Sequence, residues 1–350
     1  MSDKITYEEL IYGIGPKNGD FSSQRSLCFS REARMPAIEI PGLDFLKWQS
    51  ARRPVALLQN EVDEYFVYKT TDKAEDAPNR EIEVLKELDL YARKDWRFEK
   101  KVQFPHLRNV NENGFLYPML TGEPLSVLLD GASNPKCVLE AFSRLGEAIA
   151  AVHLVGDELG GIGSYECCFP VPRREAFTIS ELYEGVGMEF PLLLSAFFEV
   201  QKGIDSLRAN WGNRDLVHYD LRAQNILYSS ETGRISLIDW ETAGLGNGLL
   251  DLGMVCFELI RASYCSYGKL PLDWLSLHKI MVEKYCLYRG ADFSETFCGS
   301  IQYAAVSALV RCAEKLRIIG RLSRVDTLIL EHVGRLIDAP EWFLEDGGVI

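Results

Sequence analysis

Residues 216–241 read LVHYDLRAQNILYSSETGRISLIDWE. His218, Asp220 and Asn225 form the pattern H-x-D-x-x-x-x-N within this stretch, and Asp239 follows fourteen residues after Asn225, at the end of an apolar run. Phosphoryl transfer requires an acidic side chain that orients and deprotonates the attacking hydroxyl, and oxygen ligands for a Mg²⁺ ion between the β- and γ-phosphates. The spacing of these polar residues therefore predicts a phosphoryl-transfer site.

The stretch resembles the catalytic loop of the aminoglycoside phosphotransferase/choline kinase-like family, a branch of the protein-kinase-like superfamily. Members of this branch often read H-G-D-L-x-x-x-N-I-L, followed by a strand that ends in D-W or D-W-E and by the pattern G-x-x-x-x-D-L. The chain carries matching residues in the same order: Asp220-Leu221, Asn225-Ile226-Leu227, Asp239-Trp240-Glu241, and Gly246 with Asp251-Leu252. Tyr219 departs from the pattern, because the branch usually has glycine there, and we expect it to crowd the loop.

The resemblance implies a role for each polar residue of the loop. Asp220 is expected to orient the acceptor hydroxyl and to accept its proton. Asn225 and Asp239 are expected to bind Mg²⁺ through oxygen and thereby to hold the nucleotide. Arg222 is a candidate for stabilising charge on the transferred phosphoryl group, with an ordinary surface arginine as the alternative. His218 is expected to hold the loop backbone by a hydrogen bond.

Residues 65–70, YFVYKT, predict a strand, and the segment that begins at Arg80 predicts a helix. A half-buried strand lysine needs an anionic partner, because an unpaired buried ammonium is costly. The resemblance implies that Lys69 contacts the α- and β-phosphates of a nucleotide and that Glu81 is its partner on the helix. Glu83 is the competing partner, and an exposed lysine beside a solvated carboxylate is the alternative.

Residues 115–125, FLYPMLTGEPL, resemble the strand that joins the two lobes in this branch. Adenine recognition there uses backbone groups, and a proline offers a carbonyl acceptor but no N–H donor. We therefore expect Pro118 to provide the acceptor and Leu120 the donor. A buried connecting strand is the plainer interpretation, and it is compatible with adenine binding.

Composition narrows the function without deciding it. The chain has 350 residues, 47% of them hydrophobic, which suits one bilobal unit or two domains. Its net charge of −13 argues against nucleic-acid binding, and no apolar run is long enough for a membrane span. The polar N-terminus and an odd count of 9 cysteines without a C-x-x-C pair favour reduced thiols and a cytoplasmic protein.

The order of motifs predicts an α+β, bilobal protein-kinase-like fold. We expect an N-terminal extension over residues 1–42, a small lobe with a nucleotide-binding sheet and helix over 43–120, and a larger, mostly helical lobe over 121–350 that carries the catalytic loop and the acceptor site. In the large lobe, residues 138–155 predict a helix whose apolar stripe faces the core. Its members are Leu139, Phe142, Leu145, Ile149 and Val152.

The acceptor is left open by the sequence. The leading hypothesis is an ATP- and Mg²⁺-dependent kinase that phosphorylates a hydroxyl of an aminoglycoside-like, amino-alcohol or sugar compound, with GTP also considered as donor. The second is a Ser/Thr kinase that modifies a precursor peptide in lanthipeptide or thioamitide maturation beside a partner lyase. The third is a nucleotide-binding pseudokinase scaffold. A cationic acceptor needs converging carboxylates, and the candidates are Glu181, Glu184, Glu189 and Glu241.

Overall fold

The computed structural model describes residues 40, 43–48, 55–70, 77–111, 113–130, 133–159, 168–171, 190–265, 270 and 272–345. The chain separates into two compact units, Met1–Pro41 and Gly42–Ile350, and the helices and strands described below all belong to the second. The boundaries expected after residues 42 and 120 stay predictions.

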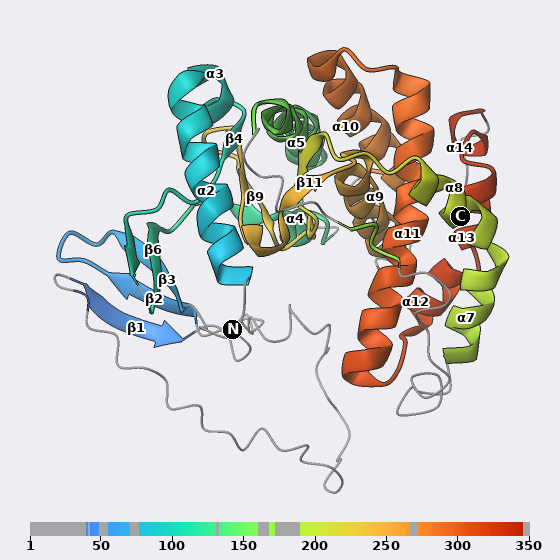
Figure 1. Ribbon diagram of the computed structural model, residues 1–350, viewed down its shortest axis with the longest axis horizontal. Coiled ribbons are helices and arrows are strands. Elements are labelled where there is room, and N and C mark those ends of the chain that lie inside the picture. Colours follow the sequence, from blue (N-terminus) through green and yellow to red (C-terminus); the bar gives the residue numbers. More distant parts are fainter. Residues whose placement is uncertain are drawn as a thin grey trace, which may run out of the picture. The chain divides into compact units, whose positions relative to one another are not determined.

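An antiparallel sheet of five strands precedes the helical part of the second unit, in the spatial order β1-β2-β3-β6-β5 (Figure 1). The strands are β1 (Asp44–Trp48), β2 (Val55–Gln59), β3 (Tyr65–Thr70), β5 (Asn109–Asn111) and β6 (Gly114–Pro118). The strand predicted for residues 65–70 is confirmed. Its place between β2 and β6 puts Lys69 in the middle of the sheet, opposite Val55 and Phe115.

Helix α2 (Ala77–Lys94) packs beside this sheet and is followed by the short helix α3 (Trp96–Glu99). Ile82, Leu85 and Leu88 are buried, and their helical spacing places them on one face of α2. Glu81 is buried on the same helix although it carries a carboxylate. A buried carboxylate needs a partner, and that partner lies in the candidate site.

Residues 216–241 contribute to two small sheets: β9 and β10 form a hairpin, and β8 pairs with the later strand β11. Two small sheets are present, one ordered β4-β10-β9-β7 and one pairing β11 with β8. Their strands are β4 (Val102–Gln103), β7 (Glu123–Pro124), β8 (Asp215–Val217), β9 (Ile226–Ser229), β10 (Arg234–Leu237) and β11 (Gly244–Gly246). The loop from β8 to β9 carries residues 218–225, and the 3₁₀ turn η3 (Trp240–Thr242) follows β10 directly after Asp239. The two loops are thereby held side by side.

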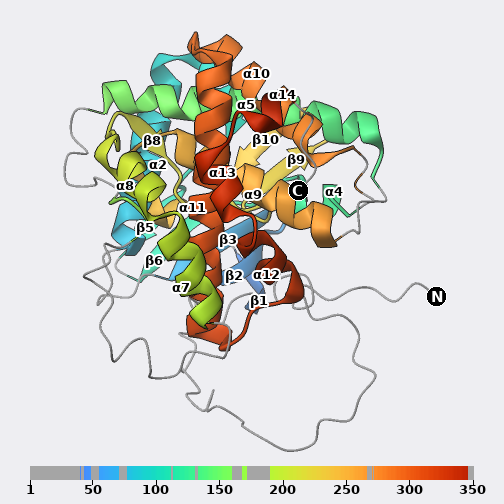
Figure 2. The ribbon, with the colours of Figure 1, turned by 90° about the vertical axis from the view of Figure 1, so that its right-hand side faces the viewer.

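Helices make up most of the chain after β6, which confirms the predicted helical lobe (Figures 1 and 2). They are α4 (Leu125–Leu128), α5 (Pro135–Val155), the 3₁₀ helix η1 (Gly156–Glu158), α7 (Phe190–Glu199), α8 (Gln201–Ala209), α9 (Leu249–Cys265), α10 (Trp274–Arg289), α11 (Phe293–Ile319), α12 (Arg324–Leu330), α13 (Val333–Asp338) and α14 (Trp342–Glu345). Among the described residues, no helix is long and apolar enough to cross a membrane.

One part of the predicted stripe on α5 is wrong. Leu139 is 39% exposed, and Val138 is fully buried in its place. The helix begins at Pro135 after the cap Asn134, three residues earlier than predicted, and Phe142, Leu145, Ile149 and Val152 are buried as expected. A residue at the edge of a helical stripe can fall on either side of it, because packing against α10 and β8 decides the orientation of the helix.

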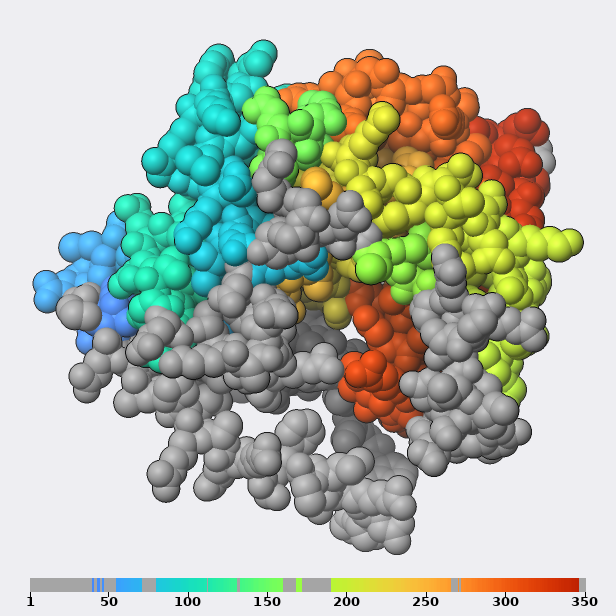
Figure 3. Space-filling view, viewed as in Figure 1, coloured from blue at the N-terminus to red at the C-terminus, as the bar shows by residue number. Residues whose placement is uncertain are grey.

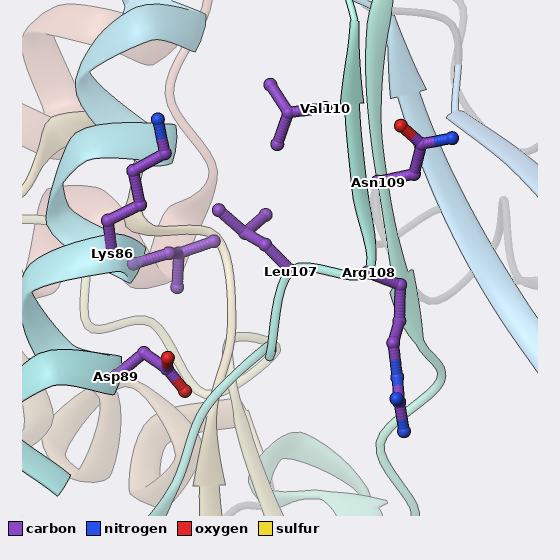
Figure 4. A pocket seen from close by; sticks show the side chains of 7 residues that line it. Lys86, Asp89, Leu107, Arg108, Asn109 and Val110 are labelled. Carbon is purple, nitrogen blue, oxygen red and sulfur yellow. The ribbon is translucent and has the colours of Figure 1, made fainter. Parts of the chain in front are cut away.

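Helices α2 and α3 lie next to the large lobe on one face of the molecule. Figure 3 shows α2 and α3, in cyan, next to the end of α5 in green. Tyr91 of α2 lies close enough to Glu158 of η1 and Tyr288 of α10 for their charges to affect its pKa, which is raised mainly by burial. A separate shallow pocket lies between α2 and β5, where Leu107 and Val110 face Lys86 (Figure 4).

His278 of α10 is a buried imidazole that is expected to make folding stability depend on pH. The ring is fully buried, and its Nε2 lies 2.8 Å from Oγ of Ser300, whose hydroxyl donates to the Phe297 carbonyl. Nε2 therefore carries the proton. Within the described residues Nδ1 has no hydrogen-bond partner, and burial lowers the pKa of His278 from 6.5 to about 3.

The unfolded chain takes up a proton at this histidine as the pH falls through about 6.5, whereas the folded chain does so only near 3. The stabilisation is thus complete above the unfolded pKa and is lost progressively below it. As the pH falls from 7.5 to 5, His278 should lower the free energy of unfolding by about 2 kcal/mol. Urea unfolding of wild type and His278→Gln at both pH values measures this difference. An equal pH-dependent loss in the two proteins would contradict the assignment.

Candidate active site

Lys69 lies in a cluster of charged side chains drawn from β3, α2 and the turn after β10. Its Nζ is 2.8 Å from Oε1 and 3.0 Å from Oε2 of Glu81, and 2.7 Å from Oδ1 of Asp239. The side chain of Lys69 is only 14% exposed and that of Glu81 only 2%. Glu83, the competing partner, is exposed. The structure therefore brings Lys69, Glu81 and Asp239 together, and Lys69 is not an exposed strand lysine.

Electrostatics keep this lysine charged. Burial disfavours the ammonium of Lys69, but Glu81, Tyr117 and Asp239 outweigh that effect and hold the pKa well above its ordinary value. For Glu81, burial raises the pKa, and the contact with Lys69 opposes the rise. The backbone N–H of Trp240 also lies 3.4 Å from Oε1 of Glu81, which ties α2 to the turn that carries Asp239.

The carboxylate of Asp220 is held by three side chains. Arg222 donates from Nε to Oδ1 at 2.7 Å, and Arg311 donates from Nη2 to the same oxygen. Asn225 donates from Nδ2 to the Asp220 carbonyl at 2.8 Å and to Oδ2 at 3.2 Å. Burial would raise the pKa of Asp220, but Arg311 and Arg222 outweigh it and lower the pKa below its ordinary value. The carboxylate is therefore ionised.

Asp251, at the start of α9, fixes the backbone of the catalytic loop. Its Oδ2 accepts from the N–H of His218 at 2.8 Å and its Oδ1 from the N–H of Tyr219 at 3.0 Å. His153 lies against the same carboxylate at 3.2 Å. The Nε2 of His218 is 2.9 Å from the carbonyl of Ile238, so its ring joins this loop to the one that carries Asp239. These bonds fix the position of the loop after β8 relative to the turn after β10.

Tyr219 shows why glycine is usual at this position. Its φ is +67°, in the left-handed region that a residue with a side chain rarely adopts. The two bonds from Asp251 hold the loop in this conformation, and the Tyr219 hydroxyl donates to the carbonyl of Cys168. The ring thus joins the catalytic loop to the segment 168–171 instead of leaving the loop open.

The donor set beside Lys69 fits a hard cation such as Mg²⁺. Lys69 engages Oδ1 of Asp239, and among the described residues no group bonds its second oxygen. Asn225 uses its Nδ2 towards Asp220, which leaves the side-chain carbonyl oxygen as a neutral donor. Carboxylate oxygens of Glu81, Asp239 and Glu241 also lie within 4.8 Å of one another. These are oxygen ligands, which Mg²⁺ prefers.

The backbone after β6 continues the antiparallel pairing with β3 by one residue. The Met119 N–H donates to the Tyr65 carbonyl at 2.9 Å, and the preceding pair in the register is Phe66 with Pro118. Successive antiparallel pairs alternate between bonded and non-bonded. The Pro118 carbonyl therefore points away from β3, on the side of the strand to which the Leu120 N–H also belongs.

Sequence reasoning missed Arg311. It lies on α11, ninety-one residues after Asp220, and its side chain is 13% exposed. An arginine within a long helix gives no local signal in the sequence, and only the tertiary structure brings Arg311 to the loop. Arg222, which was predicted from the sequence, forms an ion pair with Asp220, and its side chain is 45% exposed. Glu181, Glu184 and Glu189 lie outside the described residues.

Comparison with known families decides the assignment. The sequence profile described as the phosphotransferase enzyme family matches residues 51–267, more than half of the chain. The chain belongs to this family. It is a phosphotransferase whose acceptor group is a hydroxyl, and the resemblance seen in the catalytic-loop motif is confirmed. Among curated protein sequences, none matches this phosphotransferase significantly.

Solved structures confirm the protein-kinase-like fold of the phosphotransferase. The amicoumacin kinase hAmiN, solved with AMP-PNP, Ca²⁺ and Ami, has a TM-score of 0.55 at 12% identity, over 85% of this chain and 88% of that chain. The ethanolamine kinase of Plasmodium vivax has a TM-score of 0.52 at 13% identity, over 86% of this chain and 83% of that chain. At these identities the likeness shows the fold alone.

Proposed function

We propose that the phosphotransferase moves the γ-phosphate of ATP to a hydroxyl of a small molecule, with Mg²⁺ as its metal cofactor. The observation that carries this proposal is the pairing of Lys69 with Glu81 and Asp239. The loop that holds Asp220 is joined to the turn that holds Asp239, because His218 contacts the Ile238 carbonyl and the Ile238 N–H donates to the Asn225 carbonyl. A scaffold that no longer catalysed would have no need to keep both a buried lysine paired with two carboxylates and an ionised aspartate on the β8–β9 loop.

The nucleotide is assigned to the side of the site formed by β3, β6 and α2. Lys69, held by Glu81, is positioned to contact the α- and β-phosphates. The Pro118 carbonyl and the Leu120 N–H are assigned to the adenine edge, because both belong to the side of the strand that faces away from β3. Backbone recognition of this kind does not depend on the side chain of either residue.

Catalysis is assigned to the loop between β8 and β9. Asp220 orients the acceptor hydroxyl and takes its proton as the oxygen attacks the γ-phosphorus, while the bond to the β-phosphate oxygen breaks and ADP leaves with the electron pair. Asn225 and Asp239 are the oxygen ligands for Mg²⁺, which when bound neutralises charge between the phosphates. Arg222 contacts Asp220, and we assign it to stabilise the negative charge on the transferred phosphoryl group.

The direct test is incubation of the full chain with γ-labelled ATP, with Mg²⁺ or with EDTA. We expect hydrolysis, or transfer to an acceptor, only when the divalent ion is present, with GTP as a parallel donor. The acceptor panel contains aminoglycosides, amino-alcohols and sugars, and a separate arm contains seryl peptides. A folded protein that binds MgATP but neither hydrolyses nor transfers the phosphate would favour a pseudokinase scaffold. Label on peptides alone would move the acceptor to the peptide class.

A further inference from the structure

Two guanidinium groups donate hydrogen bonds to the carboxylate of Asp220, which we assign as the base. Arg222 and Arg311 both donate to Oδ1 of Asp220, one from the catalytic loop itself and one from α11. The side chains of Asp220 and Arg311 are 14% and 13% exposed, so this ion pair is largely shielded from water. Shielding from water strengthens the field of Arg311 at the point where the acceptor must sit, whereas Arg222 is 45% exposed.

Arg311 comes from a part of the chain beyond the family match, which ends at residue 267. Helix α11 packs against α9, whose first turn carries Asp251, and lies beside α7 and α13 (Figure 2). Arg311 shares one face of α11 with Ser307 and Lys315, because residues four apart in a helix are neighbours. Its other nitrogen, Nη1, donates to Oε2 of Glu314, which is 47% exposed. The guanidinium is therefore fixed from two sides.

Among the described residues, the charges around Asp220 disfavour a cationic acceptor. A hydroxyl that gives its proton to Asp220 must lie roughly 3 Å from this carboxylate. An ammonium on the neighbouring carbon would then lie close to both guanidiniums, while the aspartate charge is already shared between them. Two other carboxylates do not offset this positive charge. Glu314 binds the opposite terminal nitrogen of Arg311 and is partly solvated, and Asp239 is already paired with Lys69. Like charges at such separations lower affinity by on the order of tenfold or more.

We propose that Arg311, together with Arg222, determines acceptor specificity: the site takes a hydroxyl flanked by neutral or anionic groups and discriminates against one beside an ammonium. This inference rests on the proposed function and narrows its acceptor class. Hydroxy acids, sugars and seryl side chains flanked by amides share the required chemistry, and the arms of the experiment separate these sources. Amino-alcohols and unmodified aminoglycosides are disfavoured.

The test compares acceptors that differ only in charge beside the hydroxyl. The pairs are ethanolamine with N-acetylethanolamine, serinamide with N-acetylserinamide, and kanamycin with fully N-acetylated kanamycin, and glycolate is the anionic arm. Labelled ATP and Mg²⁺ are used with the full chain, and kcat/KM is measured for each acceptor. We expect wild type to prefer the neutral or anionic form by roughly tenfold or more.

Variants separate specificity from a purely structural tie between α11 and the loop. Arg311→Gln should bring the ratio of neutral to cationic acceptor towards one, and Arg311→Lys should restore most of the preference because it keeps the charge. Arg317→Gln, an exposed position on the same helix, is the matched control and should leave the ratio unchanged. A mere packing defect lowers kcat/KM for both members of a pair alike and does not move their ratio.

Preference of the wild type for the cationic members would overturn the inference. Equal rates within every pair, including no transfer to any of them while Mg²⁺-dependent ATP hydrolysis continues, would also overturn it, as would an unchanged ratio in Arg311→Gln. Failure of the proposed function looks different. In that case no Mg²⁺-dependent turnover of ATP is seen with any acceptor or with water, and the inference fails with the function on which it rests.

Discussion

Asp220→Asn is expected to lower phosphoryl-transfer turnover by on the order of 10²–10⁴-fold, the range for losing a positioned general base. The substitution keeps the shape of the side chain but removes the charge that accepts the proton. Nucleotide affinity should stay near wild type, because no contact joins Asp220 to Lys69 among the described residues. The measurement is steady-state turnover on the true acceptor together with calorimetric titration of MgATP.

Asp205→Asn is the matched control for this prediction. Asp205 lies on α8 with a side chain that is 55% exposed, and its one ion pair within the described part of the chain is with Arg208, so its loss should leave turnover unchanged. Full turnover in Asp220→Asn would mean that another group acts as the base. Reduced turnover accompanied by an equal loss of MgATP affinity would indicate that Asp220 serves nucleotide binding instead.

Asp239→Ala is expected to remove most Mg²⁺-dependent nucleotide binding. Outer-shell partners of metal ligands already cost roughly 10–100-fold in affinity when they are removed, and a direct ligand should cost at least as much. The substitution also takes away one of the two carboxylates that hold Lys69. Calorimetry with ATP in Mg²⁺ and in EDTA separates the two effects, because only loss of a metal ligand removes the difference between these conditions.

Glu241→Ala serves as the comparison, since its carboxylate lies within 4.8 Å of those of Glu81 and Asp239. We expect it to retain more of the Mg²⁺ effect than Asp239→Ala. An unchanged MgATP affinity in Asp239→Ala would contradict the assignment. Loss of the Mg²⁺ effect in Glu241→Ala alone would transfer the ligand role to that residue.

The site geometry that could be predicted from the sequence is local or follows from element order. Asp220 and Asn225 lie on one short loop between β8 and β9, so their spacing in the sequence nearly fixes their separation in space. The strand with Lys69 and the helix with Glu81 are neighbours along the chain, and packing of that helix on the sheet brings the two charges together. Such contacts leave a pattern in the sequence because few other arrangements satisfy a buried lysine.

Other features depend on contacts between distant segments and leave no such pattern. Arg311 reaches Asp220 only because α11 packs on α9, and nothing in the residues around Arg311 marks it out. Leu139 matched the helical spacing but is exposed, because the orientation of α5 is decided by what packs on it. The left-handed conformation of Tyr219 follows from bonds to Asp251, thirty-two residues away.

A crystal structure of the protein with AMP-PNP and Mg²⁺ tests the central claim most directly. We predict Mg²⁺ bound by Asn225 and Asp239, the α- and β-phosphates on Lys69, the adenine edge on the backbone of Pro118 and Leu120, and the γ-phosphate facing Asp220. A nucleotide bound elsewhere, or a metal ion held by Glu81 and Glu241 without Asn225 and Asp239, would contradict this account of the site.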